Sequence, residues 1–393
     1  MASPLPFKTA HLERDVKEKI PFIRITGENS KSIGVCHGRM LRDRIVRTWR
    51  WYEKLFMSIG ATTAMLKKRA AHFQKIIQDF DKRYADEIDG IAEGSGLESY
   101  TIYCLNARTE IALDLLRTSN EQQESTECTS VFSPTTGVLA QNWDWDEELE
   151  QLACVSEISS SKKHVILTMH EPGLLAKTGM NSSGLGVCLN ALHIPSDWKR
   201  GHLNGLPVHV ILRAILDCTT FDDVKKMLNK AKIMGTSAHI LLGAQDGRYR
   251  MIEFAGNILD FIQLPKDKMA LHTNHYLGCE SLKTHSKCGF PSDASSDSSS
   301  SRARYVRGTK LIENLKHVAD IRAMKSLLRD DLGKFPICRE MVKSSSSGGL
   351  AQALGRIGTV CSVVMDLKSL TMHITKGSPI RNKYMEYKIS RKK

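Results

Sequence analysis

A change of periodicity near residue 128 is the feature that most constrains how this chain folds. Before it, Ser32–Phe56, Ala61–Glu93 and Tyr100–Leu116 carry apolar residues at helical spacing, with charged residues on the opposite face. Gly94 and Gly96 then supply a typical helix stop. The first 127 residues are therefore predicted to be mostly helical, ending in a polar loop over Thr118–Thr126.

After this point the pattern is that of short strands. Thr129–Phe132 and Val138–Asn142 flank Pro134–Gly137, which predicts a β-hairpin. Two helices are predicted at Val208–Leu216 and Phe221–Ala231. Further strands are predicted at His164–Met169, Gly186–Ala191, Ala238–Leu242, Tyr249–Phe254, Ala270–Thr273, Thr359–Asp366 and Thr371–Thr375. This order predicts an α+β fold in which antiparallel sheets carry helical layers outside.

The charge balance does not by itself indicate a nucleic-acid partner. The chain has a formal net charge of +13, and residues 376–393 contribute seven basic residues against Glu386. The other basic residues are scattered among acids, without an aromatic-interleaved stripe or a zinc-finger pattern. We expect a solvated basic surface and no nucleic-acid site.

The ten cysteines indicate neither a metal site nor a disulfide framework. None forms a C-x-x-C pair, so we expect no metal and no cofactor. Residues 1–19 lack the apolar core of a signal peptide, and no apolar run is long enough to span a membrane. With one glycosylation sequon, at Asn181, we expect reduced thiols and a cytoplasmic location.

Cys128 is the candidate nucleophile. It lies between the polar loop and the first strand, where a lone cysteine is more often a small buried hydrophobe than a catalyst. No metal-ligand partner or papain-type histidine can be identified. The hairpin, however, should bring Asp144 of the returning strand close to Cys128. Asp144 is otherwise interpreted as a strand-end carboxylate in a turn or cap.

Two asparagines are ambiguous on local grounds. Asn181 lies in the run Gly179–Gly186 at a tight turn entering a strand, and is either a turn former or a hydrogen-bond donor. Asn274 follows a predicted strand and either terminates that strand or aims its amide at a site.

An ordered series of short motifs resembles one known family. The motifs are Ile20–Phe22, Gly34–Gly38, Glu87–Gly94, Leu105–Glu110, Cys128–Ser130, Gln141–Trp145, Glu171–Gly173, Gly205–His209, Thr273–His275 and Cys361–Val363. Together they resemble the acyl-coenzyme A:6-aminopenicillanic-acid acyltransferase family, of the N-terminal-nucleophile (Ntn) hydrolase superfamily. Each motif alone is weak, but the ordered set extends from about residue 20 to residue 380.

The resemblance implies a four-layer αββα sandwich made as a zymogen that cuts itself before Cys128. The small chain would be residues 1–127 and the large chain residues 128–393, associated as one integrated globular unit. The freed α-amino group, with a reference pKa of about 7.7–8.0, would serve as general base for the thiol of Cys128. The acyl group would pass through a thioester.

The resemblance also implies roles for individual residues. Asp144 would orient the new amine or balance its charge, and Asn274 would donate a hydrogen bond to the oxyanion. Asn181 matches a second amide donor in the related bile-salt hydrolases. One arginine after the serine-rich run would also contribute. The candidates are Arg302, Arg304 and Arg307, of which Arg304 fits the spacing best.

Three residues before Cys128 are given no catalytic role by the resemblance. Arg108 and Glu110 are predicted to form a structural ion pair rather than to act in catalysis. Glu127 precedes the nucleophile where the fungal enzyme has glycine, and it could slow self-cleavage.

The function that we expect first is hydrolysis or transfer of an acyl group from a small N-acyl or aminoacyl amine, by analogy with insect relatives that hydrolyse β-alanyl amines. One alternative is a lipid amidase similar to acid ceramidase. Another is an inactive basic binding module on the same fold. Self-cleavage would separate the enzymes from the binding module, which would instead show salt-dependent nucleic-acid retention.

Overall fold

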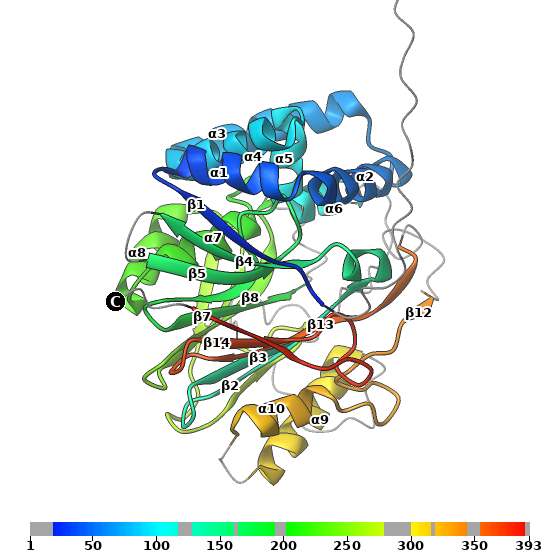
Figure 1. Cartoon of the computed structure of the whole chain (residues 1–393). Helices are drawn as coiled ribbons and strands as arrows, with labels where there is room; N and C mark the ends of the chain where they lie inside the picture. Colours follow the sequence, from blue (N-terminus) through cyan, green and yellow to red (C-terminus); the bar gives the residue numbers. More distant parts are fainter. Residues whose placement is uncertain are drawn as a thin grey trace, which may run out of the picture.

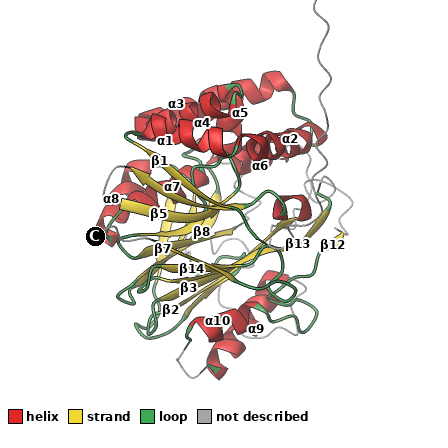
Figure 2. Cartoon of the chain, viewed as in Figure 1, coloured by secondary structure: helices red, strands yellow, loops and turns green. Residues whose placement is uncertain are grey.

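Two β-sheets lie face to face, and helices cover the outer face of each (Figure 1). The computed structural model describes residues 19–116, 128–160, 164–192, 202–278, 300–315, 319–343 and 354–389. Figure 2 shows the resulting order of helical, sheet, sheet and helical layers. The predicted αββα sandwich is therefore confirmed. The predicted loop at Thr118–Thr126 and Glu127 lie outside the described residues.

The helical layers come from different parts of the chain. The first sheet is covered by α1 (Ser30–Met40), α2 (Arg42–Ser58), α3 (Thr63–Phe80), α4 (Lys82–Ser95), α5 (Ser99–Asn106), α6 (Arg108–Leu116), α7 (Val208–Asp217) and α8 (Phe221–Ala231). The second sheet is covered by α9 (Ser300–Asn314) and α10 (Ile321–Leu328). The predicted helices at 32–56 and 100–116 are each divided in two, at Leu41 and Ala107.

The first sheet has eight strands. In spatial order they are β1 (Phe22–Gly27), β4 (Cys154–Ser160), β5 (His164–His170), β6 (Thr178–Asn181), β7 (Leu185–Ala191), β8 (Ser237–Ala244), β9 (Tyr249–Ala255) and β10 (Ile258–Ile262). All pairs are antiparallel except β1 with β4, where Phe22 lies opposite Val155 in a parallel register. The antiparallel prediction was wrong for this pair, because the chain between the two strands, which includes α1–α6 and the β2–β3 hairpin, is long enough for a parallel crossover.

The second sheet has seven strands. Their order is β11 (Ala270–His272), β2 (Thr129–Ser133), β3 (Val138–Asp146), β13 (Arg356–Asp366), β14 (Thr371–Ile374) and β15 (Met385–Lys388), with β12 (Val342–Lys343) paired to β13. The predicted β2–β3 hairpin is present. Gly137 adopts φ 73°, which favours glycine, and its N–H donates to the carbonyl of Ser133 at 2.8 Å. The register pairs Thr129 with Asn142, which brings Asp144 alongside Cys128.

Helices α1 and α4 cross at very close range through glycines. A Cβ atom on Gly34 would lie 2.0 Å from the carbonyl oxygen of Glu87, and one on Gly90 would lie 2.3 Å from that of Lys31. Gly38 and Gly94 meet the facing backbone in the same way. The glycines within the Gly34–Gly38 and Glu87–Gly94 motifs are therefore explained by backbone-to-backbone packing.

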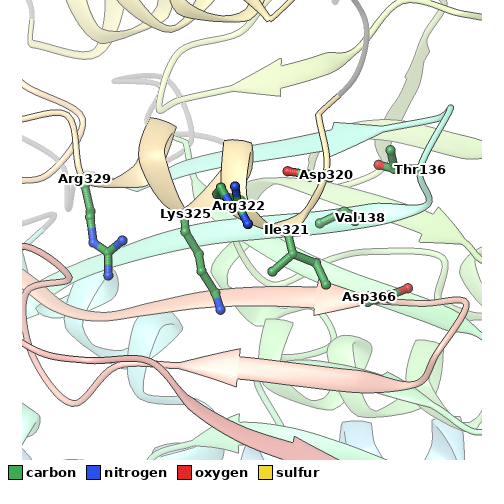
Figure 3. Close-up of a pocket in the computed structure, with 8 residues that line it drawn as sticks. All are labelled: Thr136, Val138, Asp320, Ile321, Arg322, Lys325, Arg329 and Asp366. Carbon is green, nitrogen blue, oxygen red and sulfur yellow. The ribbon is translucent and has the colours of Figure 1, made fainter.

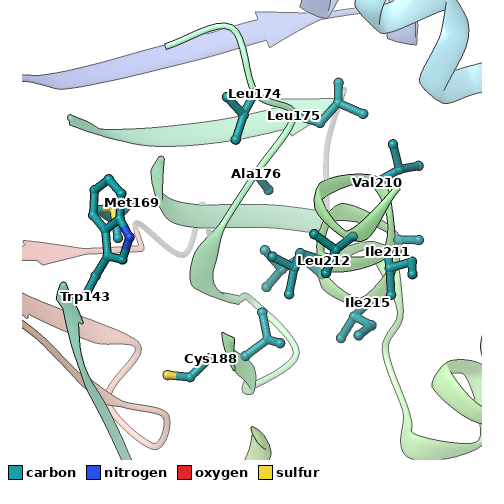
Figure 4. Packing of buried hydrophobic residues seen from close by; sticks show 14 of the residues in the cluster. Trp143, Met169, Leu174, Leu175, Ala176, Cys188, Val210, Ile211, Leu212 and Ile215 are labelled. Carbon is teal, nitrogen blue, oxygen red and sulfur yellow. The ribbon is translucent and has the colours of Figure 1, made fainter. Parts of the chain in front are cut away.

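The space between the sheets is filled by apolar side chains that surround the beginning of β2. Figure 4 shows part of the buried cluster, in which Trp143 of β3 and Met169 of β5 lie on one side of the view and the apolar residues of α7 on the other. The same cluster includes buried residues of α1–α6 and of both sheets. The core thus combines residues from both sides of the predicted cleavage point.

Candidate active site

Cys128 lies directly before β2, and only 5% of its surface is exposed. Burial and the negative charge of Asp144 raise the pKa of its thiol to about 11, while a hydrogen bond from the backbone N–H of Asp144 and the charges of Lys177 and Arg304 act in the opposite direction. The thiol is therefore almost entirely protonated at neutral pH and needs a base before it can attack.

Asn274 holds the main chain of Cys128 from one side. Its Oδ1 atom accepts a hydrogen bond from the Cys128 N–H at 2.8 Å, and its Nδ2 atom donates to the carbonyl of Ala191 at 2.9 Å. The backbone N–H of Asn274 in turn donates to Ser301 Oγ at 2.7 Å. Oδ1 thus makes Asn274 an acceptor beside the Cys128 nitrogen. Nδ2 carries two N–H groups, of which one is donated to Ala191, so the expected role as an oxyanion donor stays a prediction.

Arg304 holds the same main chain from α9. Its guanidinium is fully buried, and Nη1 donates to the carbonyl of Cys128 at 2.9 Å and to Thr129 Oγ1 at 2.8 Å. Nη2 donates to Asn274 Oδ1 at 2.9 Å. Of the three candidate arginines, Arg304 is thus the one that the structure brings to Cys128, whereas Arg307 forms an ion pair with Asp330.

Asp144 is buried on β3 beside Cys128. Its Oδ1 atom accepts a hydrogen bond from Thr359 Oγ1 of β13 at 2.7 Å. Thr359 and Asp144 are register partners across the second sheet, so the hairpin and β13 together fix the carboxylate. The structure therefore brings Asp144, Asn274 and Arg304 together around Cys128.

Asn181 is not part of this group, so the prediction that it acts in the site was wrong. Its Nδ2 atom donates to the carbonyls of Leu216 and Cys218, and its Oδ1 atom accepts from the backbone N–H groups of Ser183 and Leu185. The amide therefore closes the β6–β7 turn and ties it to the end of α7. The turn-forming alternative is the one that the structure supports.

Asn190, which the sequence reasoning missed, occupies the site instead. Asn190 lies near the end of β7, five residues after the first residue of that strand, Leu185. It is therefore about 16 Å along the strand from the β6–β7 turn that Asn181 closes. Its Nδ2 atom donates to the carbonyl of Cys128 at 3.1 Å, and its Oδ1 atom accepts from Ser130 Oγ at 2.6 Å. The available signal was a buried amide within an otherwise apolar strand.

A buried cluster of charges lies next to Cys128. Glu171 pairs with Arg108 and, at 3.1 Å, with Lys177, and it accepts a hydrogen bond from the hydroxyl of Tyr52. Although burial opposes ionisation, these two cations hold the pKa of Glu171 well below its usual range. The predicted ion pair of Arg108 with Glu110 was wrong, because Arg108 turns to Glu171.

Lys177 connects this cluster to Cys128. Its Nζ atom lies 3.1 Å from the ring centroid of Trp143, the residue that precedes Asp144 on β3. Burial, with a contribution from Arg108, lowers the pKa of Lys177 to about 8, while Glu171 and Cys128 act to raise it. A buried lysine with such a pKa is characteristic of functional sites.

Other features of the described residues bear on cofactors and membranes. In the described segments, no three His, Cys, Asp or Glu side chains are grouped so that they could hold a metal ion. The eight cysteines that fall within those segments are free thiols. No helix in the part of the chain that the structure describes is long and apolar enough to cross a membrane.

The groove shown in Figure 3 is separate from this site. It has a volume of about 480 Å³ and lies between α10, the β2–β3 turn and the end of β13. Its lining includes Lys325, Arg329 and Asp366 but none of the residues around Cys128.

A four-layer sandwich with a buried, strand-end cysteine between its sheets defines the class of Ntn-fold acyltransferases and amide hydrolases. The model of the family described as acyl-coenzyme A:6-aminopenicillanic acid acyl-transferase matches residues 131–381. The chain belongs to this family. The matched range begins three residues after Cys128.

Individual proteins resemble the chain to different extents. The 40 kDa form of the acyl-coenzyme A:6-aminopenicillanic-acid acyltransferase of Emericella nidulans is 27% identical over 65% of this chain and 70% of its own length. Among solved structures, the N-acylethanolamine-hydrolyzing acid amidase orthologue of Caenorhabditis elegans has a TM-score of 0.41 at 10% identity, covering 62% of this chain and 93% of its own. Penicillin V acylase of Agrobacterium tumefaciens has a TM-score of 0.39 at 13% identity, covering 67% and 86%.

Proposed function

We propose that this chain is a self-processing cysteine amidohydrolase or acyltransferase in which cleavage after Glu127 exposes Cys128 as an N-terminal nucleophile. The observation that carries the proposal is the set of side-chain hydrogen bonds to the main chain of Cys128. Its N–H is bonded by Asn274, and its carbonyl is bonded by Asn190 and Arg304. Polar side chains from β7, from α9 and from the segment after β11 thus converge on the main chain of this one residue, as expected where a reactive group must be held in place.

The same contacts suit the chemistry of the cut enzyme. The new α-amine of Cys128 would remain beside Asn274 Oδ1, which accepts a hydrogen bond and so orients the amine lone pair toward the thiol. With a reference pKa of about 7.7–8.0, this amine can take the thiol proton at working pH. The thiolate then attacks the substrate carbonyl, the amine product leaves, and water or another amine resolves the thioester.

The substrate that we propose is a small N-acyl or aminoacyl amine. Family membership and the relative from Emericella nidulans, which is named for acyl transfer from acyl-coenzyme A, support acyl transfer as the reaction type. The buried, largely apolar surroundings of Cys128 are consistent with a compact acyl group. The cytoplasmic location stays a prediction that imaging of the tagged protein would test.

Intact-mass analysis of the purified protein, beside a Cys128→Ala variant, tests the proposal. We expect chains 1–127 and 128–393 from the wild type, apart from any processing of Met1, and a single uncut chain from the variant. The variant should also lack amidase activity. A wild-type chain that hydrolyses amides while its Glu127–Cys128 bond is intact would refute the mechanism.

A further inference from the structure

The uncut chain lacks the base that the mature enzyme would use. Before cleavage, the nitrogen of Cys128 belongs to a peptide bond, and its N–H is donated to Asn274 Oδ1 at 2.8 Å. A peptide nitrogen has no basic lone pair, so it cannot accept the thiol proton. With the thiol pKa raised to about 11, only about one molecule in 10⁴ carries a thiolate at pH 7. Self-cleavage therefore needs a different proton acceptor.

Three charged groups act on the thiol of Cys128, and they differ in their ability to accept a proton. They are Asp144, Lys177 and Arg304. The guanidinium of Arg304 has no acceptor atom. Asp144 Oδ1 already accepts a hydrogen bond from Thr359 at 2.7 Å, and a carboxylate is ordinarily a much weaker base than an amine. Transfer to an amine with a pKa of about 8 is unfavourable by only about 10³-fold.

Lys177 is a cation when it pairs with Glu171, and its surroundings can also hold the neutral amine, which is the form that accepts a proton. Its side chain is 5% exposed, and a neutral amine has two N–H groups and one lone pair. Glu171 Oε2 at 3.1 Å and the face of the Trp143 ring offer partners for the two N–H groups. This arrangement leaves the lone pair for a third partner. The β2–β3 register pairs Thr129 with Asn142, which puts Trp143 beside Cys128, and Lys177 lies over the ring of Trp143.

We propose that Lys177 Nζ accepts the thiol proton of Cys128 during self-cleavage, an inference that rests on the proposed function. The sulfur then attacks the carbonyl carbon of Glu127, and the C–N bond to Cys128 breaks. The proton held on Lys177 passes to the departing nitrogen, which becomes the α-amine. Water hydrolyses the resulting thioester, giving the carboxylate of Glu127 and the free thiol. Lys177 is needed for the cut, after which the α-amine takes over as base.

The pH dependence of cleavage in the wild-type precursor is the first test. Precursor made by cell-free synthesis at pH 6 is moved to buffers from pH 6.5 to 9.5, and the uncut fraction is followed by gel and mass spectrometry. The groups facing Lys177 are Glu171, Arg108, His209, Cys128 and Cys361. We expect the rate to rise with pH and level off, with a midpoint near 8. A flat profile, or a rate still rising toward pH 11, would overturn the proposal.

Substitutions of Lys177 provide the second test. Lys177→Met removes the base, and Lys177→Arg keeps the positive charge but cannot release a proton at these pH values. Both should slow cleavage by about 10²- to 10⁴-fold and abolish the inflection near pH 8. Turnover per cleaved molecule should fall far less. If the Lys177→Arg variant cleaved itself within threefold of the wild-type rate, a positive charge alone would be enough for cleavage, and the role of Lys177 as proton acceptor would be refuted.

A matched control separates the base from a general effect of a buried cation. Arg213 is also buried and pairs with Glu87 at 2.6 Å, away from Cys128. The soluble, folded fraction of Arg213→Met should cleave near the wild-type rate. If it is as slow as Lys177→Met, the assignment fails. Normal cleavage in the Lys177 variants would refute only this inference, whereas an uncut but active wild type would refute self-cleavage itself.

Discussion

Arg304 is the residue whose contacts tie Cys128 to the second helical layer. It bonds the carbonyl of Cys128, the hydroxyl of Thr129 and the amide of Asn274, all without exposure to solvent. Losing it leaves several buried acceptors without their donor, at about 1–3 kcal/mol each. It therefore links catalytic geometry with stability.

We predict that Arg304→Met lowers both cleavage and amidase activity by at least about 10²-fold. Urea unfolding should show a loss of about 3 kcal/mol. Arg307→Met on the same helix is the control, because its partly exposed ion pair with Asp330 should contribute no more than about 1 kcal/mol. Equal effects of the two substitutions would argue against the assigned role.

Substitutions of the two asparagines of the β6–β7 hairpin should have different effects, one on activity and the other on stability. Asn190→Ala removes a donor from the Cys128 carbonyl, and we predict a fall in kcat of about 10²-fold. Asn181→Ala leaves two carbonyls of the α7 end without their donor, so it should lower stability by about 1–3 kcal/mol and leave kcat per folded molecule unchanged. The check is kcat from active-site titration together with thermal unfolding.

The sequence indicated part of the site and concealed the rest. Cys128 and Asp144 could be joined because a hairpin fixes its own register. Asn190 could not be placed near them from the sequence, because it lies on the opposite sheet. No local sequence pattern predicts which residues of two stacked sheets face each other. Lys177 and Glu171 were missed for another reason: charged residues are usually exposed, and only tertiary packing shows that these are buried as a pair.

Among the elements, the long periodic segments were predicted well, whereas several strands were missed, although the equally short β11 and β14 were found. The helices of the first 116 residues follow from apolar spacing. Strand β6 has only four residues, β4 reads CVSEISS with polar residues throughout, and β1 finds its partner more than 120 residues later. Their pairing is set by neighbours in space, which local propensity does not describe.

At the crossing of α1 and α4, we expect that adding a side chain at one of the contacting glycines lowers the stability of the fold. Gly34→Ala would place its Cβ 2.0 Å from the carbonyl of Glu87. We expect a net loss of about 1–3 kcal/mol, although alanine is the better helix former by about 1 kcal/mol. Thermal unfolding measures the loss. Glu93→Ala, at an exposed position of α4, is the control and should change stability by less than about 1 kcal/mol.

The junction of α6 with α7 should make stability depend on pH. The carboxylate of Glu110 accepts the N–H of Val208 at 2.9 Å, and burial raises its pKa to about 7. Because the folded state then holds the proton more tightly, this contribution is complete below pH 4.5 and is lost as the pH rises through 7. Glu110→Gln should match the wild type near pH 4.5 and exceed it by up to about 3 kcal/mol at pH 8 in urea unfolding. A constant difference would contradict this.

At the scale of the whole molecule, the two proposed chains share one interior. Strand β1 is hydrogen-bonded into the first sheet beside β4, and the buried ion pairs Arg108–Glu171 and Glu87–Arg213 join the two parts. We predict that both chains co-elute in size-exclusion chromatography after cleavage, at the volume of uncut Cys128→Ala. Separation should require denaturant, and release of the small chain in native buffer would contradict the prediction.

The first and last described segments meet at one edge of the sandwich. The hydroxyl of Tyr387 donates to the carbonyl of Ile20 at 2.9 Å, and its ring stacks on Phe22 with centroids 5.0 Å apart. A short peptide could therefore join residue 389 to residue 19, while the chain is opened between 127 and 128. Such a circular permutant, after loss of its initiator methionine, would be born with Cys128 at its amino terminus, already equipped for acyl transfer without ever having been a zymogen.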